Sequence, residues 1–95
     1  MSIYVVLSRL TDEGRKTLKS KPSRLKEVNE EMAKMGAKVK EQYALLGKYD
    51  FLNIIEAEDP LTMTKVLVEI GSRGTLETMT LPAMSVDDLL RKLKG

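Results

Sequence analysis

The chain has 95 residues, of which 42% are hydrophobic and 32% charged, so its size and composition fit one folded domain spanning residues 1–95 and exclude a disordered chain. It contains no cysteine and no histidine, which excludes disulfides, thiolate chemistry and the commonest zinc ligand, and we expect neither a metal nor a cofactor. The net charge is only +2, but ten basic residues lie between residues 9 and 40 and nine acidic residues between 41 and 90, a split that suits self-association as well as two differently charged solvated faces.

The first third of the chain predicts a strand followed by two helices. Residues 3–9 are rich in β-branched and aromatic side chains, as strands are. Thr11 can cap a short helix, although Gly14 weakens it. Pro22 suits the start of a longer helix, and Gly36 stands where that helix should end. The longer helix carries one apolar stripe, formed by Leu25, Val28, Met32 and Met35.

Residues 37–46 and 49–57 predict a β-hairpin. Gly47-Lys48 lies between them and suits a two-residue turn of type II′, which would fix the register of the two strands. One face of the hairpin would then carry Val39, Tyr43, Leu45, Leu52 and Ile54, and we expect this face to lie under the helices. The other face would carry Lys40, Gln42, Ala44, Leu46, Tyr49, Phe51, Asn53 and Ile55.

The remaining residues predict a helix, a strand and a terminal helix. Asp59 and Pro60 suit the cap and first turn of a helix whose apolar stripe includes Met63, Val66, Leu67 and Ile70. Residues 75–84 indicate a fourth strand, in which Pro82 suits an edge. A short helix begins near Ser85, with acidic residues first and basic residues last, as the helix dipole prefers.

This order of elements predicts an α+β fold of the ferredoxin-like βαββαβ type, followed by a short C-terminal helix. Right-handed crossovers would place both main helices on one face of a four-stranded antiparallel sheet. The other face of the sheet would remain uncovered.

We expect the uncovered face to include Gln42, Phe51, Asn53 and Ile55. This set is too apolar for a solvated surface and too polar for a core, so it predicts a homodimer, or a higher homo-oligomer, packed through the uncovered face. Gln42 would lie opposite Asn53 in the hairpin. The two amides could form a cross-strand hydrogen bond or a polar spot that holds a ligand.

Gly47, Tyr49 and Asp50 match a Gly-x-Tyr-Asp pattern, and together with the opening YVVLSRLTDEG and the late TLETMTLPAM they make the chain resemble the GYD domain family. The resemblance covers nearly the whole chain. It implies a ferredoxin-like domain of the dimeric α/β-barrel type. The family has no established activity that the resemblance can carry over, so no catalytic residue is transferred to this sequence.

The candidate ligand-binding residues are Tyr43, Tyr49, Asp50 and Asn53. Tyr49 and Asp50 are read either as local scaffolding of the hairpin or as the polar rim of a pocket. A ring and a carboxylate that flank a turn suit both interpretations.

Three classes of function follow, and the first is favoured. It is a small homo-oligomeric module that binds a small molecule or has a structural role. The alternative is a cofactor-independent enzyme, monooxygenase- or isomerase-like, that uses a Tyr/Asp acid–base pair. Nucleic-acid binding is disfavoured, because the basic run from Arg15 to Lys26 is accompanied by few aromatic residues and no RNA-binding motif. No membrane span or signal sequence is visible, so a cytoplasmic location is expected.

Overall fold

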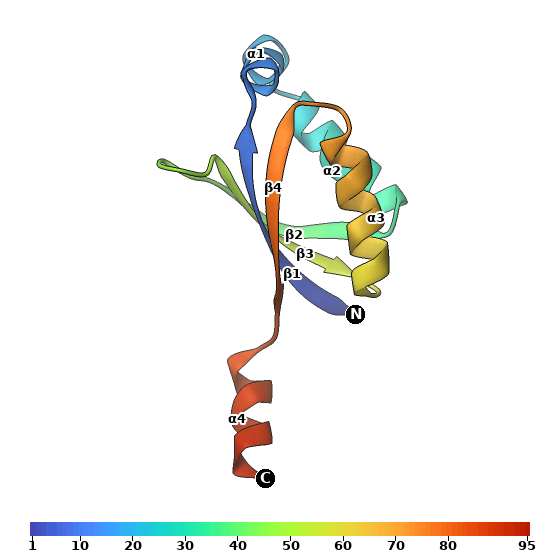
Figure 1. Cartoon of the computed structure of the whole chain (residues 1–95), viewed down its shortest axis with the longest axis vertical. Coiled ribbons are helices and arrows are strands. Elements are labelled where there is room, and N and C mark those ends of the chain that lie inside the picture. Colours follow the sequence, from blue (N-terminus) through green and yellow to red (C-terminus); the bar gives the residue numbers. More distant parts are fainter.

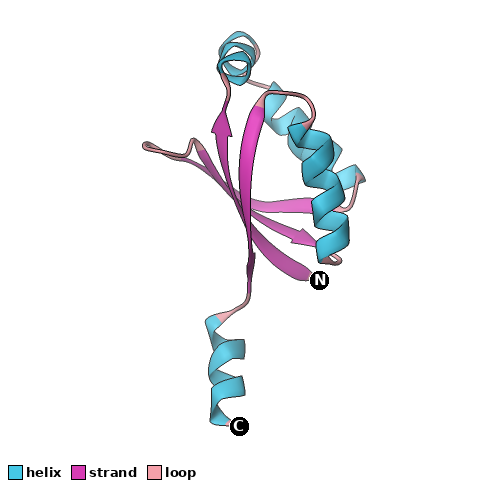
Figure 2. Ribbon diagram, viewed as in Figure 1, coloured by secondary structure: helices cyan, strands magenta, loops and turns pink.

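Four antiparallel strands form one sheet in the order β2-β3-β1-β4 in the computed structural model, which describes residues 1–95 (Figure 1). The strands are β1 (Ser2–Leu10), β2 (Ala37–Ala44), β3 (Phe51–Ala57) and β4 (Leu76–Ala83). The helices are α1 (Asp12–Ser20), α2 (Arg24–Lys34), α3 (Pro60–Gly71) and α4 (Val86–Lys94). Figure 2 shows α2 and α3 on one side of the sheet, with α1 at the end of β1. The ferredoxin-like α+β fold is therefore confirmed.

The helix ends lie where local chemistry places them. Thr11 caps α1, because its hydroxyl accepts a hydrogen bond from the Gly14 N–H at 3.1 Å. Asp59 caps α3 through a 2.8 Å bond from the Thr62 N–H. Gly36 follows α2 with a φ of +106°, a left-handed backbone that favours glycine.

The core lies between α2, α3 and one side of the sheet. The nine buried side chains that form it come from the two central strands, from the start of β2 and from the inner faces of both helices. They are Tyr4, Val6, Met32, Ala37, Ile55, Ala57, Met63, Val66 and Ile70. The apolar stripes predicted for the two helices supply Met32, Met63, Val66 and Ile70, so those stripes are confirmed as core-facing.

The hairpin register is confirmed near the connecting loop and altered further from it. Gln42 pairs with Asn53 and Ala44 with Phe51, as predicted. A β-bulge between Val39 and Glu41 then shifts the ladder, so Val39 pairs with Ile55. The predicted pairs of Lys40 with Ile55 and of Val39 with Glu56 are therefore wrong.

The connection between β2 and β3 is a longer loop and not a two-residue turn. The ladder ends at Ala44 and Phe51, and the predicted pairing of Leu46 with Tyr49 does not form. The Asp50 carbonyl still accepts a hydrogen bond from the Leu45 N–H at 2.8 Å, and the Asp50 N–H donates to the Ser8 carbonyl of β1 at 2.8 Å. This bond draws the start of β3 toward β1, and Gly47, with a φ of +145°, lies in the resulting loop.

The predicted faces of the hairpin were inverted, except at Val39, which the bulge brings to the covered side, where it packs against the core as predicted. Phe51, Asn53 and Ile55 are buried on the helix side of the sheet, where Gln42 also lies, and do not form an uncovered surface. Residues of one strand alternate between the two faces of the sheet, so the period of two in the sequence divides them into two groups. It does not indicate which group lies under the helices. The pairing of Asn53 with Val6, itself a core residue, shows which set is internal.

The surface without helices, here called the open face, is strongly apolar. Cross-strand pairs place Leu52 and Met79 on either side of Leu7, and Ile54 and Leu81 on either side of Val5. The same registers also place four charged residues on this face: Arg9, Glu41, Glu56 and Glu77. The apolar residues of the open face are Ile3, Val5, Leu7, Tyr43, Leu52, Ile54, Met79 and Leu81. It is the face on which sequence reasoning placed the covering helices.

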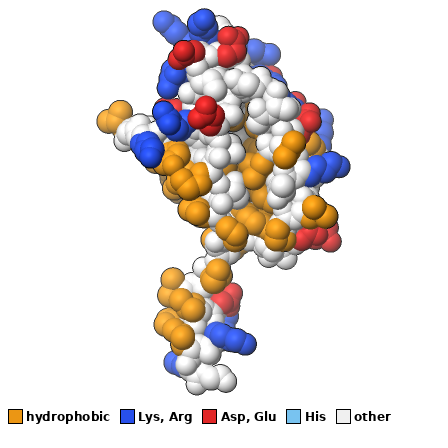
Figure 3. All heavy atoms as spheres, viewed as in Figure 1, with side chains coloured by type: hydrophobic (Ala, Val, Ile, Leu, Met, Phe, Trp, Pro, Cys, Tyr) orange, Lys and Arg blue, Asp and Glu red, His pale blue; other side chains and the backbone are white.

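Helix α4 projects from the end of β4, away from the other helices (Figure 1). Its four large apolar side chains, Val86, Leu89, Leu90 and Leu93, are all exposed. In Figure 3 hydrophobic side chains continue from the body along the segment before α4 and onto one side of that helix. None of the helices is long and apolar enough to cross a membrane.

Candidate functional site

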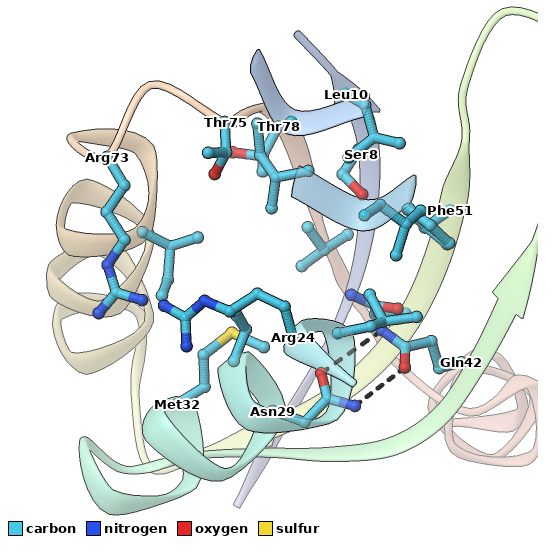
Figure 4. Close-up of a pocket in the computed structure, with 18 of the residues that line it drawn as sticks. Ser8, Leu10, Arg24, Asn29, Met32, Gln42, Phe51, Arg73, Thr75 and Thr78 are labelled. Atoms are coloured by element: carbon cyan, nitrogen blue, oxygen red, sulfur yellow. Dashed lines mark hydrogen bonds between the residues drawn. The ribbon is translucent and has the colours of Figure 1, made fainter. Parts of the chain in front are cut away.

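A pocket of about 290 Å³ lies between the helices and the covered side of the sheet (Figure 4). All four strands and the helices α1, α2 and α3 contribute to its lining. Gly14 lets α1 approach closely, because a Cβ added there would lie 2.1 Å from the backbone oxygen of Thr75. The site is thus formed by segments distant in the sequence.

The walls of the pocket are mainly aliphatic. Eleven of its 21 lining residues are hydrophobic, and they come from the sheet and from the inner faces of the helices. The main contributors are Val6, Val28, Met32, Ile55, Leu67 and Ile70. Such walls favour the apolar part of a small molecule, since protein pockets of this size generally combine apolar walls with a few polar groups.

The polar groups of the pocket include all three amide side chains of the protein. Asn29 of α2 and Gln42 of β2 form a reciprocal pair, with nitrogen-to-oxygen distances of 2.9 and 3.4 Å (dashed lines in Figure 4). Asn53 lies opposite Gln42 on β3 and is only 8% exposed. Its Oδ1 is buried without a hydrogen-bond partner. The predicted hydrogen bond between Gln42 and Asn53 is therefore absent, and Gln42 is paired with Asn29 instead.

Two arginines at the pocket are held by glutamates that do not line it. Glu31 accepts a hydrogen bond from Arg73 and forms an ion pair with Arg24, with nitrogen-to-oxygen distances of 3.0 Å for both. The hydrogen bond from Arg73, helped by the nearby charge of Arg24, lowers the pKa of Glu31 below its ordinary value. No aspartate or glutamate lines the pocket, and no group of three or more acidic side chains is placed to hold a metal ion.

The Gly-x-Tyr-Asp segment lies outside this pocket. The Asp50 carboxylate accepts a hydrogen bond from the Leu10 N–H at 2.7 Å and so binds the hairpin loop to the end of β1. Tyr49 lies in a separate depression with Arg9 and Glu77, and the Lys48 ammonium is 5.9 Å from its ring centre. Asp50 therefore has a scaffolding role, and neither Tyr49 nor Asp50 lines the pocket.

Tyr43 is also away from the pocket, on the open face. Its hydroxyl donates to the Glu41 carboxylate at 2.8 Å, and this bond raises the pKa of Tyr43. Of the four candidate ligand residues, only Asn53 lines the pocket. Sequence reasoning missed Ser8, Asn29 and Arg24, and only the scarcity of amides in the chain pointed toward Asn29.

The profile of the GYD domain family matches residues 4–93. The chain belongs to the GYD domain family. This GYD domain is 48% identical over 95 residues to a Thermus thermophilus protein named glutamine synthetase and cystathionine beta-lyase binding protein, covering 99% of this chain and all of that one. The family resemblance inferred from the Gly-x-Tyr-Asp pattern is thereby confirmed.

Solved structures share the fold of the GYD domain. The crystal structure of MtbAldR matches with a TM-score of 0.67 at 16% identity, covering 88% of this chain and 52% of that one, so the chain spans about half of its length. TTHA0845 from Thermus thermophilus matches with a TM-score of 0.59 at 25% identity, covering 90% of this chain and 96% of that one. These similarities support the ferredoxin-like fold of the dimeric α/β-barrel type.

Proposed function

We propose that the protein is a homodimeric binding module that docks onto metabolic enzymes, with glutamine synthetase and cystathionine β-lyase as the first candidates. The observation that carries this proposal is the 48% identity, over the whole of both chains, to a protein named for binding those two enzymes. Close sequence similarity along the full length favours a similar exposed surface, and hence similar partners.

The open face supports the homodimer. Its apolar side chains span all four strands, and Met79 and Leu81 are 42% and 46% exposed. An apolar sheet surface of this extent usually marks an interaction site. A second copy of the chain is a suitable occupant, because a two-fold axis would pack the same apolar rows against each other. The pairing of Arg9 with Glu77 at one end of the face supplies both signs of charge at its rim.

Helix α4 extends the same apolar surface. Nine residues are too few for a helix that is stable alone in water, so an exposed apolar stripe on so short a helix calls for a neighbour. Met84, between β4 and α4, is also exposed and joins the two apolar surfaces. In the proposed dimer, α4 therefore packs on the partner subunit as an arm.

Light scattering coupled to gel filtration tests the dimer. The double variant Met79→Asp/Leu81→Asp places two charges on the open face, and we expect it to be a folded monomer because burying those charges is costly. The matched control is Val68→Asp, which makes the same kind of change at a 66% exposed position of α3 and should remain a dimer. A wild-type protein that elutes as a monomer would overturn this interface.

Binding to the enzymes is measured separately. Glutamine synthetase and cystathionine β-lyase from the organism that encodes this protein are each immobilised on a sensor. Binding of the wild-type protein to each enzyme is then measured by biolayer interferometry. We expect saturable binding to at least one of them. If neither enzyme is bound by a protein that is dimeric in solution, the docking role is wrong while the dimer stands.

A further inference from the structure

We propose that the pocket between the helices and the sheet binds a small, uncharged, mostly apolar molecule that carries one hydroxyl group, and that this hydroxyl pairs with Asn53. The site is independent of the proposed enzyme docking and of the proposed dimer. It lies on the covered side of the sheet, whereas the dimer is assigned to the open face.

The first reason is the unfilled volume. Ligand pockets are concave and mostly apolar, with a few polar groups that orient the ligand. This pocket of about 290 Å³ opens to solvent, and its walls from Val28, Met32, Leu67 and Ile70 offer aliphatic surface that a bound molecule would cover. An engineered apolar cavity of about 150 Å³ already binds benzene. This pocket therefore has room for a ring and a short substituent.

The second reason is the unpaired amide of Asn53. Buried polar side chains are nearly always hydrogen-bonded, and Asn53 is only 8% exposed while its Oδ1 has no partner. The neighbouring amides Asn29 and Gln42 bond to each other, and neither donates to the Asn53 oxygen. A hydroxyl group can donate to the oxygen of an amide or accept from its nitrogen, so it pairs with Asn53 whichever end it meets.

The third reason is the charge of the lining. An ammonium group would find no carboxylate in the pocket, since none lines it. An anion would have to compete with Glu31 for Arg24 and Arg73, and with Glu27 for Arg24 as well. The surroundings therefore favour an uncharged molecule. The buried Ser8, at 3% exposure, adds an uncharged hydroxyl group to the lining.

The test compares phenol with toluene, two molecules of nearly equal shape that differ by a hydroxyl and a methyl group. Methyl NMR spectra of the full chain are recorded during titration with each probe. We expect phenol to shift the methyl signals of Val28, Met32, Leu67 and Ile70 and to bind about fivefold or more tightly than toluene. Equal affinities, or shifts confined to Leu52 and Ile54 of the open face, would overturn the proposal.

The role of Asn53 is tested by Asn53→Leu, which replaces the amide with an apolar group of similar size. We expect this variant to lose the preference for phenol and to bind toluene more tightly than the wild type does. The matched control is Thr80→Val, which removes the other unpaired buried polar atom at a position that does not line the pocket. The control should keep the preference, and a preference that survives Asn53→Leu would exclude Asn53 as the partner. The wild-type comparison decides whether the pocket is a site at all, even if Asn53→Leu does not fold.

Discussion

Asp50 shows how a family motif can serve the scaffold. Its carboxylate accepts the Leu10 N–H at 2.7 Å, and its own N–H donates to the Ser8 carbonyl at 2.8 Å. These two bonds close the end of β1 against the start of β3, beside the pocket residues Ser8, Leu10 and Phe51. A single residue, through its carboxylate and its backbone N–H, thus fixes one end of the pocket without lining it.

Replacing Asp50 with alanine should destabilise the fold. The change leaves the Leu10 N–H without its acceptor, so we expect the free energy of unfolding to fall by about 1–3 kcal/mol. Urea denaturation followed by circular dichroism measures this loss. Asp50→Asn keeps an oxygen acceptor and should recover part of the stability. An unfolding free energy equal to that of the wild type would contradict the scaffolding role.

At the scale of elements, Glu31 joins two helices that are distant in the sequence. It lies on α2 and binds Arg24 of the same helix as well as Arg73, which follows α3. Arg24 and Arg73 line the pocket, so the ionised carboxylate of Glu31 links α2 to the end of α3 beside it.

This bridge predicts a pH dependence. The pKa of Glu31 is lowered in the folded protein by the hydrogen bond from Arg73, so its contribution to stability is present above its ordinary pKa and lost as the pH falls through the lowered value. Glu31→Gln should therefore lower the melting temperature at neutral pH and have little effect in acid, as thermal unfolding across pH will show. Glu30→Gln, at the exposed neighbouring position, should have little effect at any pH. A Glu31→Gln effect that is constant with pH would contradict the bridge.

The elements themselves were predictable because their signals are local. Thr11 and Asp59 are caps that act within a few residues, and the apolar stripe from Met63 to Ile70 repeats with the helical period. The covered face of the hairpin was not predictable in this way, because a strand with apolar residues on both sides fits either orientation. The bulge beside Val39 was also missed, since it depends on pairing between strands.

The pocket was predictable only in part for the same reason. Asn53 could be selected from the sequence because amides are rare in it, and it does line the pocket. Tyr43 could not be excluded, since its position on the opposite side of the sheet follows from the face assignment. Ser8 and Arg24 reach the site only through tertiary approach of β1 and α2.

At the scale of the whole molecule, α4 is the feature that the protomer alone leaves without contacts. With α4 included, the longest dimension of the protomer is 52 Å, and the apolar side chains of α4 face solvent. Burying a leucine fully contributes about 1.5–3 kcal/mol, so a partner that covers several such side chains gains substantial affinity.

Removing residues 86–95 should therefore weaken the dimer while leaving the fold of the protomer intact. We expect the dissociation constant of the dimer to rise about tenfold or more, as sedimentation equilibrium can measure. Leu89→Asp/Leu93→Asp should act in the same direction, whereas Lys92→Glu, which leaves the apolar side of the helix unchanged, should have a much smaller effect. An unchanged dissociation constant after truncation would show that α4 is not part of the interface.

The bulge in β2 has a consequence for how copies of the protein meet. Strands β2 and β4 form the two edges of the sheet, where unpaired backbone groups invite uncontrolled strand addition and aggregation. On β2 the irregular ladder beside Val39 and the flanking lysines Lys38 and Lys40 oppose such pairing. On β4 the ring of Pro82 removes a donor. Because both edges oppose strand addition, the protein can expose the apolar open face of its sheet without assembling into fibres through its edge strands.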